Sequence, residues 1–230
     1  MKIIGLIGGM SWESSLEYYR IINKKVRTEL GGLHSAKIIL YSVDFEEVEV
    51  LQHQGKWDEL TLVMSHAAGS LEKAGADFIV ICTNTMHKMA DDLQKTIGIP
   101  ILHIADATAE AVQRQNLKKV GLLGTKFTME QAFYKGRLSE NYGLDVLIPG
   151  EEDRESVHSV IYEELCLGTL RDSSRQVFLQ IIKDLIDRGA EGIILGCTEI
   201  PLLIQQKDIS VPVFDTTQIH AESAVFKALE

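Results

Sequence analysis

Residues 75–85, GADFIVICTNT, have a near copy at residues 189–199, GAEGIILGCTE. Both segments begin with Gly and Ala, continue with an apolar run typical of a buried β-strand, and end in small polar side chains. Parallel α/β sheets bind their ligands at the carboxyl ends of the strands. The two polar ends are therefore the first candidates for a functional site.

Two further segments recur in the same order. KIIGLIGGM at residues 2–10 matches KKVGLLGTK at 118–126, and IPIL at 99–102 matches VPVF at 211–214. One explanation is that parallel α/β sheets share glycine-rich turns around apolar strands. The nearly constant spacing of the three pairs favours the other explanation, an internal duplication that yields two similar α/β lobes related by a pseudo-twofold axis.

Short β-rich runs alternate with longer helical periodicities along the chain, without hairpin turns, which predicts parallel sheets flanked by helices. The pattern divides the chain into a first lobe of residues 1–104 with 216–230 and a second lobe of residues 105–215. We expect the active site in the cleft between the lobes. The predicted strands are 2–7, 37–43, 77–82, 100–103, 118–123, 144–148, 191–196 and 211–214, the clearest helices are 12–30, 57–74 and 86–96, and residues 42–57 are expected to form a loop.

Composition excludes several classes of protein. The chain has 230 residues, of which 45% are hydrophobic and 24% charged, as in globular proteins, and its net charge of −10 argues against nucleic-acid or anionic-membrane partners. No apolar run approaches the roughly 18 residues of a membrane span. Three sparse cysteines fit a reducing compartment. We expect a cytoplasmic protein with a small-molecule ligand, and a homodimer is an open alternative to a monomer.

The repeat alignment distinguishes Cys82 from its neighbour Thr83. It places Thr83 on Cys197 and Cys82 on Gly196. Because neighbouring strand residues point in opposite directions, Thr83 and Cys197 should face the substrate while Cys82 packs in the core. A group on each side of a carbon suits removal of a proton from one face and its return to the other. Backbone N–H groups at such turns can lower the pKa of a thiol such as Cys197.

Four motifs together resemble the aspartate/glutamate racemase family: GGM at 8–10, CTNT at 82–85, GT at 124–125 and GCTE at 196–199. GGMSWES and NTMH resemble its L-aspartate/glutamate-specific, or broad amino-acid, subgroup. The resemblance implies an amino-acid substrate, no cofactor, no metal, and the catalytic pair Thr83 and Cys197, with L to D conversion kinetically favoured. The substrate-binding residues that it implies are Met10, Ser11, Gln52, Asn84, Thr85, Thr125 and Thr198.

The sequence departs from the family pattern at three places. Thr83 stands where the family usually has a first cysteine, residues 42–57 contain no arginine, and Cys166 replaces the lysine of an IYExxK pattern. The preferred side chain, acidic or small and polar, is therefore open. His87 is expected on the surface or behind the site. The alternative functions are a single-cysteine decarboxylase of malonate-like diacids and a two-lobed carboxylate-binding protein.

Overall fold

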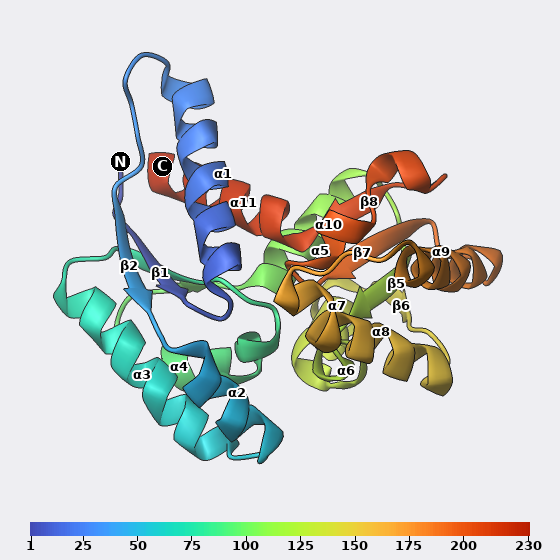
Figure 1. Ribbon diagram of the computed structural model, residues 1–230. Coiled ribbons are helices and arrows are strands. Elements are labelled where there is room, and N and C mark those ends of the chain that lie inside the picture. Colours follow the sequence, from blue (N-terminus) through green and yellow to red (C-terminus); the bar gives the residue numbers. More distant parts are fainter. The chain divides into compact units, whose positions relative to one another are not determined.

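The computed structural model describes residues 1–230. The chain forms two compact units, and the first unit contains both ends of the chain (Figure 1). Unit 1 comprises Met1–Ile104 and His220–Glu230, and unit 2 comprises Ala105–Ile219. The chain returns to unit 1 inside the last helix, α11 (Thr216–Leu229). None of the helices combines the length and the apolar character needed to cross a membrane.

Unit 1 is built on a four-stranded parallel sheet with the order β2-β1-β3-β4. Its strands are β1 (Ile4–Gly8), β2 (Ile38–Ser42), β3 (Phe78–Ile81) and β4 (Ile101–Leu102). Its helices are α1 (Trp12–Leu30), α2 (Phe45–His53), α3 (Trp57–Lys73), the 3-10 turn η1 (Thr85–Met89), α4 (Ala90–Gln94) and the greater part of α11.

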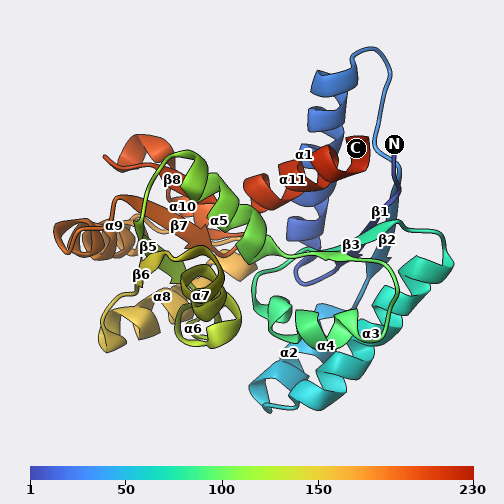
Figure 2. The ribbon, with the colours of Figure 1, turned by 180° about the vertical axis from the view of Figure 1, so that it is seen from behind.

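Helices cover both faces of this sheet, with α1 and α11 on one face and α2, α3 and α4 on the other (Figures 1 and 2). Successive residues along each strand point to opposite faces of the sheet. Leu6 and Val80 belong to the core cluster with α1 and α11, whereas Ile7 and Ile81 belong to the cluster with α2, α3 and α4. The central strands β1 and β3 are buried on both faces, which explains why they read as continuous apolar runs.

Unit 2 has a second four-stranded parallel sheet with the order β6-β5-β7-β8. Its strands are β5 (Lys119–Gly124), β6 (Asp145–Leu147), β7 (Gly192–Gly196) and β8 (Val213–Asp215). Its helical elements are α5 (Ile104–Arg114), α6 (Lys126–Glu130), the π-helical turn η2 (Ala132–Gly136), α7 (Arg137–Tyr142), α8 (Glu151–Glu163), η3 (Leu165–Leu167), α9 (Asp172–Asp187), α10 (Ile200–Leu203) and η4 (Gln206–Asp208).

The two sheets repeat each other in order and in register. Gly5 on β1 is paired with Ile79 on β3, and at the aligned positions Gly121 on β5 is paired with Ile193 on β7. Strand order is also the same, with the aligned strands in the same places. The predicted fold class, two parallel α/β sheets from a duplicated segment, is thus confirmed.

Two local predictions are wrong. Residues 42–57, expected as a loop, contain α2, whose N-cap Asp44 accepts a hydrogen bond from the backbone N–H of Glu46 at 3.0 Å. The single helix expected at 86–96 is divided into η1 and α4. The division falls at Met89, whose dihedral angles, φ −100° and ψ 2°, leave the helical region.

Candidate active site

The carboxyl edge of the unit 1 sheet gathers the first group of candidate residues. β1 and β3 are parallel neighbours, so the segments that follow them leave the sheet at the same edge. Met10 and Ser11 follow β1, and the turn of Thr83, Asn84 and Thr85 follows β3.

The two candidates after β1 and the candidate on α2 have structural roles of their own. Ser11 is the N-cap of α1, and its hydroxyl accepts a hydrogen bond from the backbone N–H of Ser14 at 3.4 Å. Met10 is buried in the core cluster with α3, and Gln52 is a buried amide on α2. These three candidates are thus held by the core or by helix α1 rather than by mobile surface segments.

Cys82 and Thr83 differ as the alternation rule predicts. The Cys82 side chain is fully buried in the cluster with α1 and α11, together with Phe78 and Val80. This burial raises the pKa of the Cys82 thiol. The prediction that Cys82 packs in the core is confirmed. Thr83 is half-buried, and its carbonyl accepts a hydrogen bond from Nδ1 of His87 at 2.8 Å.

The second group lies at the carboxyl edge of the unit 2 sheet, where β5 and β7 end side by side. Gly124 and Gly196 are directly paired, and Thr125 and Cys197 follow them. A Cβ atom on Gly124 would lie 2.7 Å from the Gly196 carbonyl oxygen, and a Cβ atom on Gly196 would lie 2.9 Å from the Leu123 carbonyl oxygen. Glycine at both positions lets the backbones approach closely and brings the following residues together.

Cys197 forms a buried pair with a carboxylate that the sequence reasoning did not single out. Its thiol donates a hydrogen bond to Oε2 of Glu199 at 3.0 Å, and the Thr198 hydroxyl donates to the same oxygen at 2.6 Å. Cys197 is 7% exposed and Glu199 8%. The sequence signal for Glu199 was its place in the GCTE motif, two residues after the cysteine.

The electrostatic environment favours the protonated form of the Cys197 thiol. Burial raises the pKa of the Cys197 thiol well above its ordinary value, and the charge of Glu199 and the neighbouring Cys166 raise it further. The expectation that this turn lowers the thiol pKa is therefore wrong. The helix that follows, α10, has four residues, too few to offset burial beside a carboxylate.

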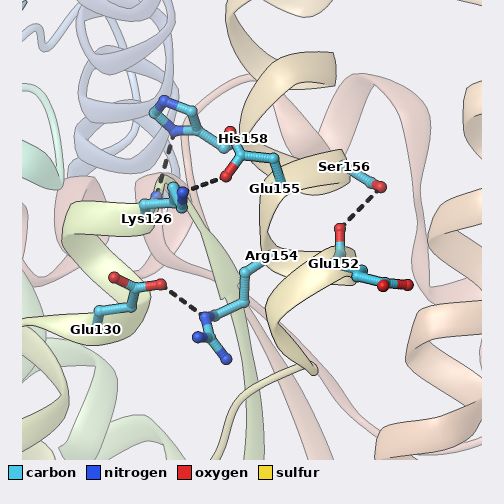
Figure 3. Close-up of polar contacts among 7 residues, drawn as sticks. All are labelled: Lys126, Glu130, Glu152, Arg154, Glu155, Ser156 and His158. Atoms are coloured by element: carbon cyan, nitrogen blue, oxygen red, sulfur yellow. Dashed lines mark hydrogen bonds and ion pairs between the residues drawn. The ribbon is translucent and has the colours of Figure 1, made fainter.

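Thr125 is fixed by the helix that it begins. Its hydroxyl accepts a hydrogen bond from the backbone N–H of Thr128 at 3.3 Å, as the N-cap of α6. Contacts to α8 then hold α6 in place: Lys126 pairs with Glu155, and Nδ1 of His158 accepts from the Lys126 backbone N–H at 3.3 Å (Figure 3). Arg154 and Glu130 add an ion pair of 2.7 Å between the same two helices (Figure 3).

Comparison with known proteins agrees with the motifs. The profile of the Asp/Glu/hydantoin racemase family matches residues 7–224. The broad-specificity amino-acid racemase RacX of Bacillus subtilis is 25% identical over 228 residues, which cover 97% of this chain and 96% of RacX.

Two crystal structures cover this chain and their own chains completely. A candidate Asp/Glu racemase from Yersinia pestis is 58% identical with a TM-score of 0.95, and an aspartate racemase homologue from Pyrococcus horikoshii is 39% identical with a TM-score of 0.86. The resemblance that the motifs indicated is confirmed. The chain belongs to the Asp/Glu/hydantoin racemase family and is an isomerase of the amino-acid racemase type.

Proposed function

We propose that the protein racemises the Cα of an acidic or small polar amino acid without a cofactor, with Cys197 as the base for the L enantiomer and Thr83 serving the opposite face. One observation carries the proposal: the buried Cys197 thiol is hydrogen-bonded to a buried carboxylate, Glu199, at 3.0 Å. The relatives support the substrate class, since RacX is a broad-specificity amino-acid racemase and the P. horikoshii protein an aspartate racemase homologue.

Glu199 supplies the proton acceptor that a thiol of raised pKa requires. The proton on Sγ of Cys197 moves to Oε2 of Glu199, and the negative charge moves to sulfur, so the pair keeps a single negative charge. The thiolate then removes the α-proton of the L substrate. The Cα–H bond breaks, an S–H bond forms, and the electron pair passes into the α-carboxylate to give an enediolate.

Neutral hydrogen-bond donors would hold the α-carboxylate and stabilise the charge that develops on it. The sequence candidates for this role carry amide or hydroxyl groups at the two strand edges: Asn84, Thr85, Thr125 and Thr198. Met10, Ser11 and Gln52 would line the remainder of the substrate site. Donors fixed by the fold stabilise such a charge without reorganising as the reaction proceeds.

Thr83 would complete the reaction by giving a proton to the opposite face of Cα and recovering one from water, and the protonated Glu199 would give its proton to the hydroxide that remains. An aliphatic hydroxyl delivers a proton to a strongly basic carbanion far more readily than it removes one from carbon. Cα exchange is therefore faster from the L enantiomer than from the D enantiomer, and the kinetic preference for L to D is a preference in kcat at saturating substrate, since kcat/KM is equal in the two directions. The equilibrium itself is unbiased, because enantiomers have equal free energies in water.

The test is to incubate each chiral L-amino acid of the standard set with the purified protein in deuterated water. Chiral chromatography measures the D product, and NMR measures deuterium at Cα. We expect acidic or small polar amino acids to give both, and Cys197→Ala to give neither while it still binds the substrate in calorimetry.

Two other outcomes would overturn the proposal. Release of carbon dioxide from disubstituted malonates, without exchange of any amino acid, would identify a decarboxylase. Unchanged carboxylate affinity in wild type and Cys197→Ala, with no exchange in either, would identify a binding protein.

A further inference from the structure

Three buried histidines lie together in unit 1, behind the Thr83 turn. His87, His103 and His220 are 1%, 6% and 0% exposed. The ring centroids of His87 and His103 are 4.6 Å apart, and those of His87 and His220 are 5.5 Å apart. The chain has no group of three or more His, Cys, Asp or Glu side chains placed to hold a metal ion. His87 was expected either on the surface or behind the candidate site. Its burial excludes the surface and leaves the position behind the site.

Both ring nitrogens of His87 have backbone partners that fix its protonation. Nδ1 lies 2.8 Å from the Thr83 carbonyl oxygen, which can only accept, so Nδ1 carries the proton. Nε2 accepts from the backbone N–H of Ile104 at 3.2 Å, so Nε2 is unprotonated. His87 is therefore a neutral ring in one tautomer. Burial, with His103 and His220 nearby, lowers the pKa of His87 well below its ordinary value.

His220 is fixed in the opposite tautomer. Its Nε2 donates to the Leu102 carbonyl at 2.8 Å, and its Nδ1 accepts from the Tyr18 hydroxyl at 2.8 Å. Tyr18 lies on α1 and Leu102 on β4. The two rings thus tie the Thr83 turn to the residues where the chain leaves unit 1, at Ile104, and returns to it, at His220.

The second unit has no equivalent of this arrangement. The repeat alignment places Pro201 at the position of His87, and proline has no side-chain donor or acceptor. A histidine hydrogen-bonded to the backbone of the turn is therefore found at the Thr83 turn and not at the Cys197 turn, so the duplicated fold does not require it.

We propose that His87 is a positioning residue: its neutral imidazole holds the backbone of Thr83 so that the Thr83 hydroxyl can return a proton to the substrate. This inference rests on the proposed function. A second proton on Nε2 would face the Ile104 N–H, a donor against a donor. It would also put a charge beside His103 and His220, and His220 is in turn bonded to the Tyr18 hydroxyl. Protonation of His87 at low pH therefore breaks its hydrogen bond with Ile104 and loosens its hold on the Thr83 turn.

Two variants separate the two bonds of His87. In His87→Asn the amide nitrogen takes the place of Nδ1 and can still donate to the Thr83 carbonyl. In His87→Gln the amide oxygen takes the place of Nε2 and can still accept from Ile104, but the bond to Thr83 is lost. Both variants lose the ring, so the loss of packing is matched. His34→Asn, at an exposed residue, is the control for the substitution itself.

The readout is the ratio of D product formed to deuterium incorporated into recovered L substrate. Cys197 alone gives incorporation, whereas D formation also needs Thr83. We expect His87→Gln to lower the ratio at least about tenfold, as displacement of a positioned group does, and His87→Asn to lower it less. An unchanged ratio in both variants, with exchange and D formation falling together, would overturn the proposal by leaving His87 a purely structural role.

A second measurement keeps the inference testable if the variants do not fold. Long-range proton–nitrogen NMR of wild-type histidines should show His87 with a proton on Nδ1 alone from about pH 8 to about pH 6. The neutral ring of His220 should carry its proton on Nε2. A proton on Nε2 of His87 would overturn the geometry. If the wild type exchanges no amino acid, the proposed function fails, and the NMR result still decides the protonation of His87.

Discussion

The Thr83 turn and the Cys197 turn occupy the same place in the two repeated sheets but are held in different ways. In the Cys197 turn the side chain of the proposed base is bonded, since the thiol donates to the Glu199 carboxylate. In the Thr83 turn the backbone is bonded, since the Thr83 carbonyl accepts from His87. One turn offers a thiol with its own proton acceptor, and the other offers a hydroxyl on a fixed backbone.

The difference extends beyond the two catalytic candidates. The alignment pairs Glu199 with Thr85 and His87 with Pro201, so neither turn has the supporting residue of the other. Strand order and register were retained in both units. The duplicated scaffold therefore tolerates different chemistry at equivalent edges. The proposed asymmetry of the reaction therefore rests on the neighbours of the two residues as well as on the exchange of a cysteine for a threonine.

The largest expected effect comes from removing the thiol. Cys197→Ser should lower Cα exchange of the L substrate at least about a thousandfold, because an aliphatic hydroxyl is a far weaker acid than a thiol. Cys82→Ala is the matched control, since Cys82 packs with α1 and α11 in the core. Proton NMR in deuterated water measures both. Equal losses in the two variants would show that the alternation argument chose the wrong cysteine.

Glu199→Gln tests the acceptor beside the thiol. We expect exchange to fall about a hundredfold, the usual contribution of a positioned base, because the amide cannot take the thiol proton. The same substitution at Glu191, which accepts backbone N–H bonds at the amino end of β7, is the control.

The resting pKa of Cys197 should move in the opposite direction from activity in Glu199→Gln. The charge of Glu199 raises this pKa, so its removal lowers the pKa and thiolate absorbance appears at lower pH. Faster exchange in this variant would mean that Glu199 suppresses the thiolate instead of forming it.

Thr83→Cys should make the two turns more alike. In the wild type we expect little Cα exchange from the D enantiomer, because Thr83 is a poor base. The cysteine should raise D exchange at least about tenfold, since a thiol ionises near pH 8.5 and a hydroxyl does not. Thr83→Ser keeps the hydroxyl and should leave D exchange low. Equal exchange from both enantiomers in the wild type would mean that another group supplies the second base.

The structural features that could be predicted from the sequence are those set by the hydrophobic period and by the internal repeat. The buried central strands, their common register and the packing of Cys82 follow from alternation and alignment, and the structure has all three. α2 was missed because it has only nine residues and because its run EVEV alternates polar and apolar side chains as a strand does. The burial of His87 depends on contacts to residues such as Ile104, which no local pattern in the sequence encodes. The state of Cys197 depends on its burial and on Glu199, whose local signal in the GCTE motif was present but does not reveal the burial.

The smallest expected effect is on stability, and it has opposite signs for the two turns. The folded-state pKa of His87 is lowered. The contribution of the neutral His87 ring to the free energy of unfolding is therefore complete above the unfolded-state pKa of about 6.5 and is lost as the pH falls below that value. The folded-state pKa of Cys197 is raised, so its contribution is complete below about 8.5 and is lost as the pH rises above that value. One proton changes the free energy of unfolding by at most about 1.4 kcal/mol per pH unit.

Amide hydrogen exchange, corrected for intrinsic rates, can separate the two losses. The experiment needs a Cys82→Ala background, because the buried Cys82 thiol also has a raised pKa and would add an alkaline loss to the Thr83 turn. From about pH 6.5 to 5, residues 83–87 should lose protection before residues 197–199, and from about pH 8.5 to 9.5 the order should reverse. His87→Asn should flatten the acid limb alone, and Cys197→Ser the alkaline limb alone. If both turns lost protection together at each end, the pH dependence would be global unfolding and the two turns would not be independently held.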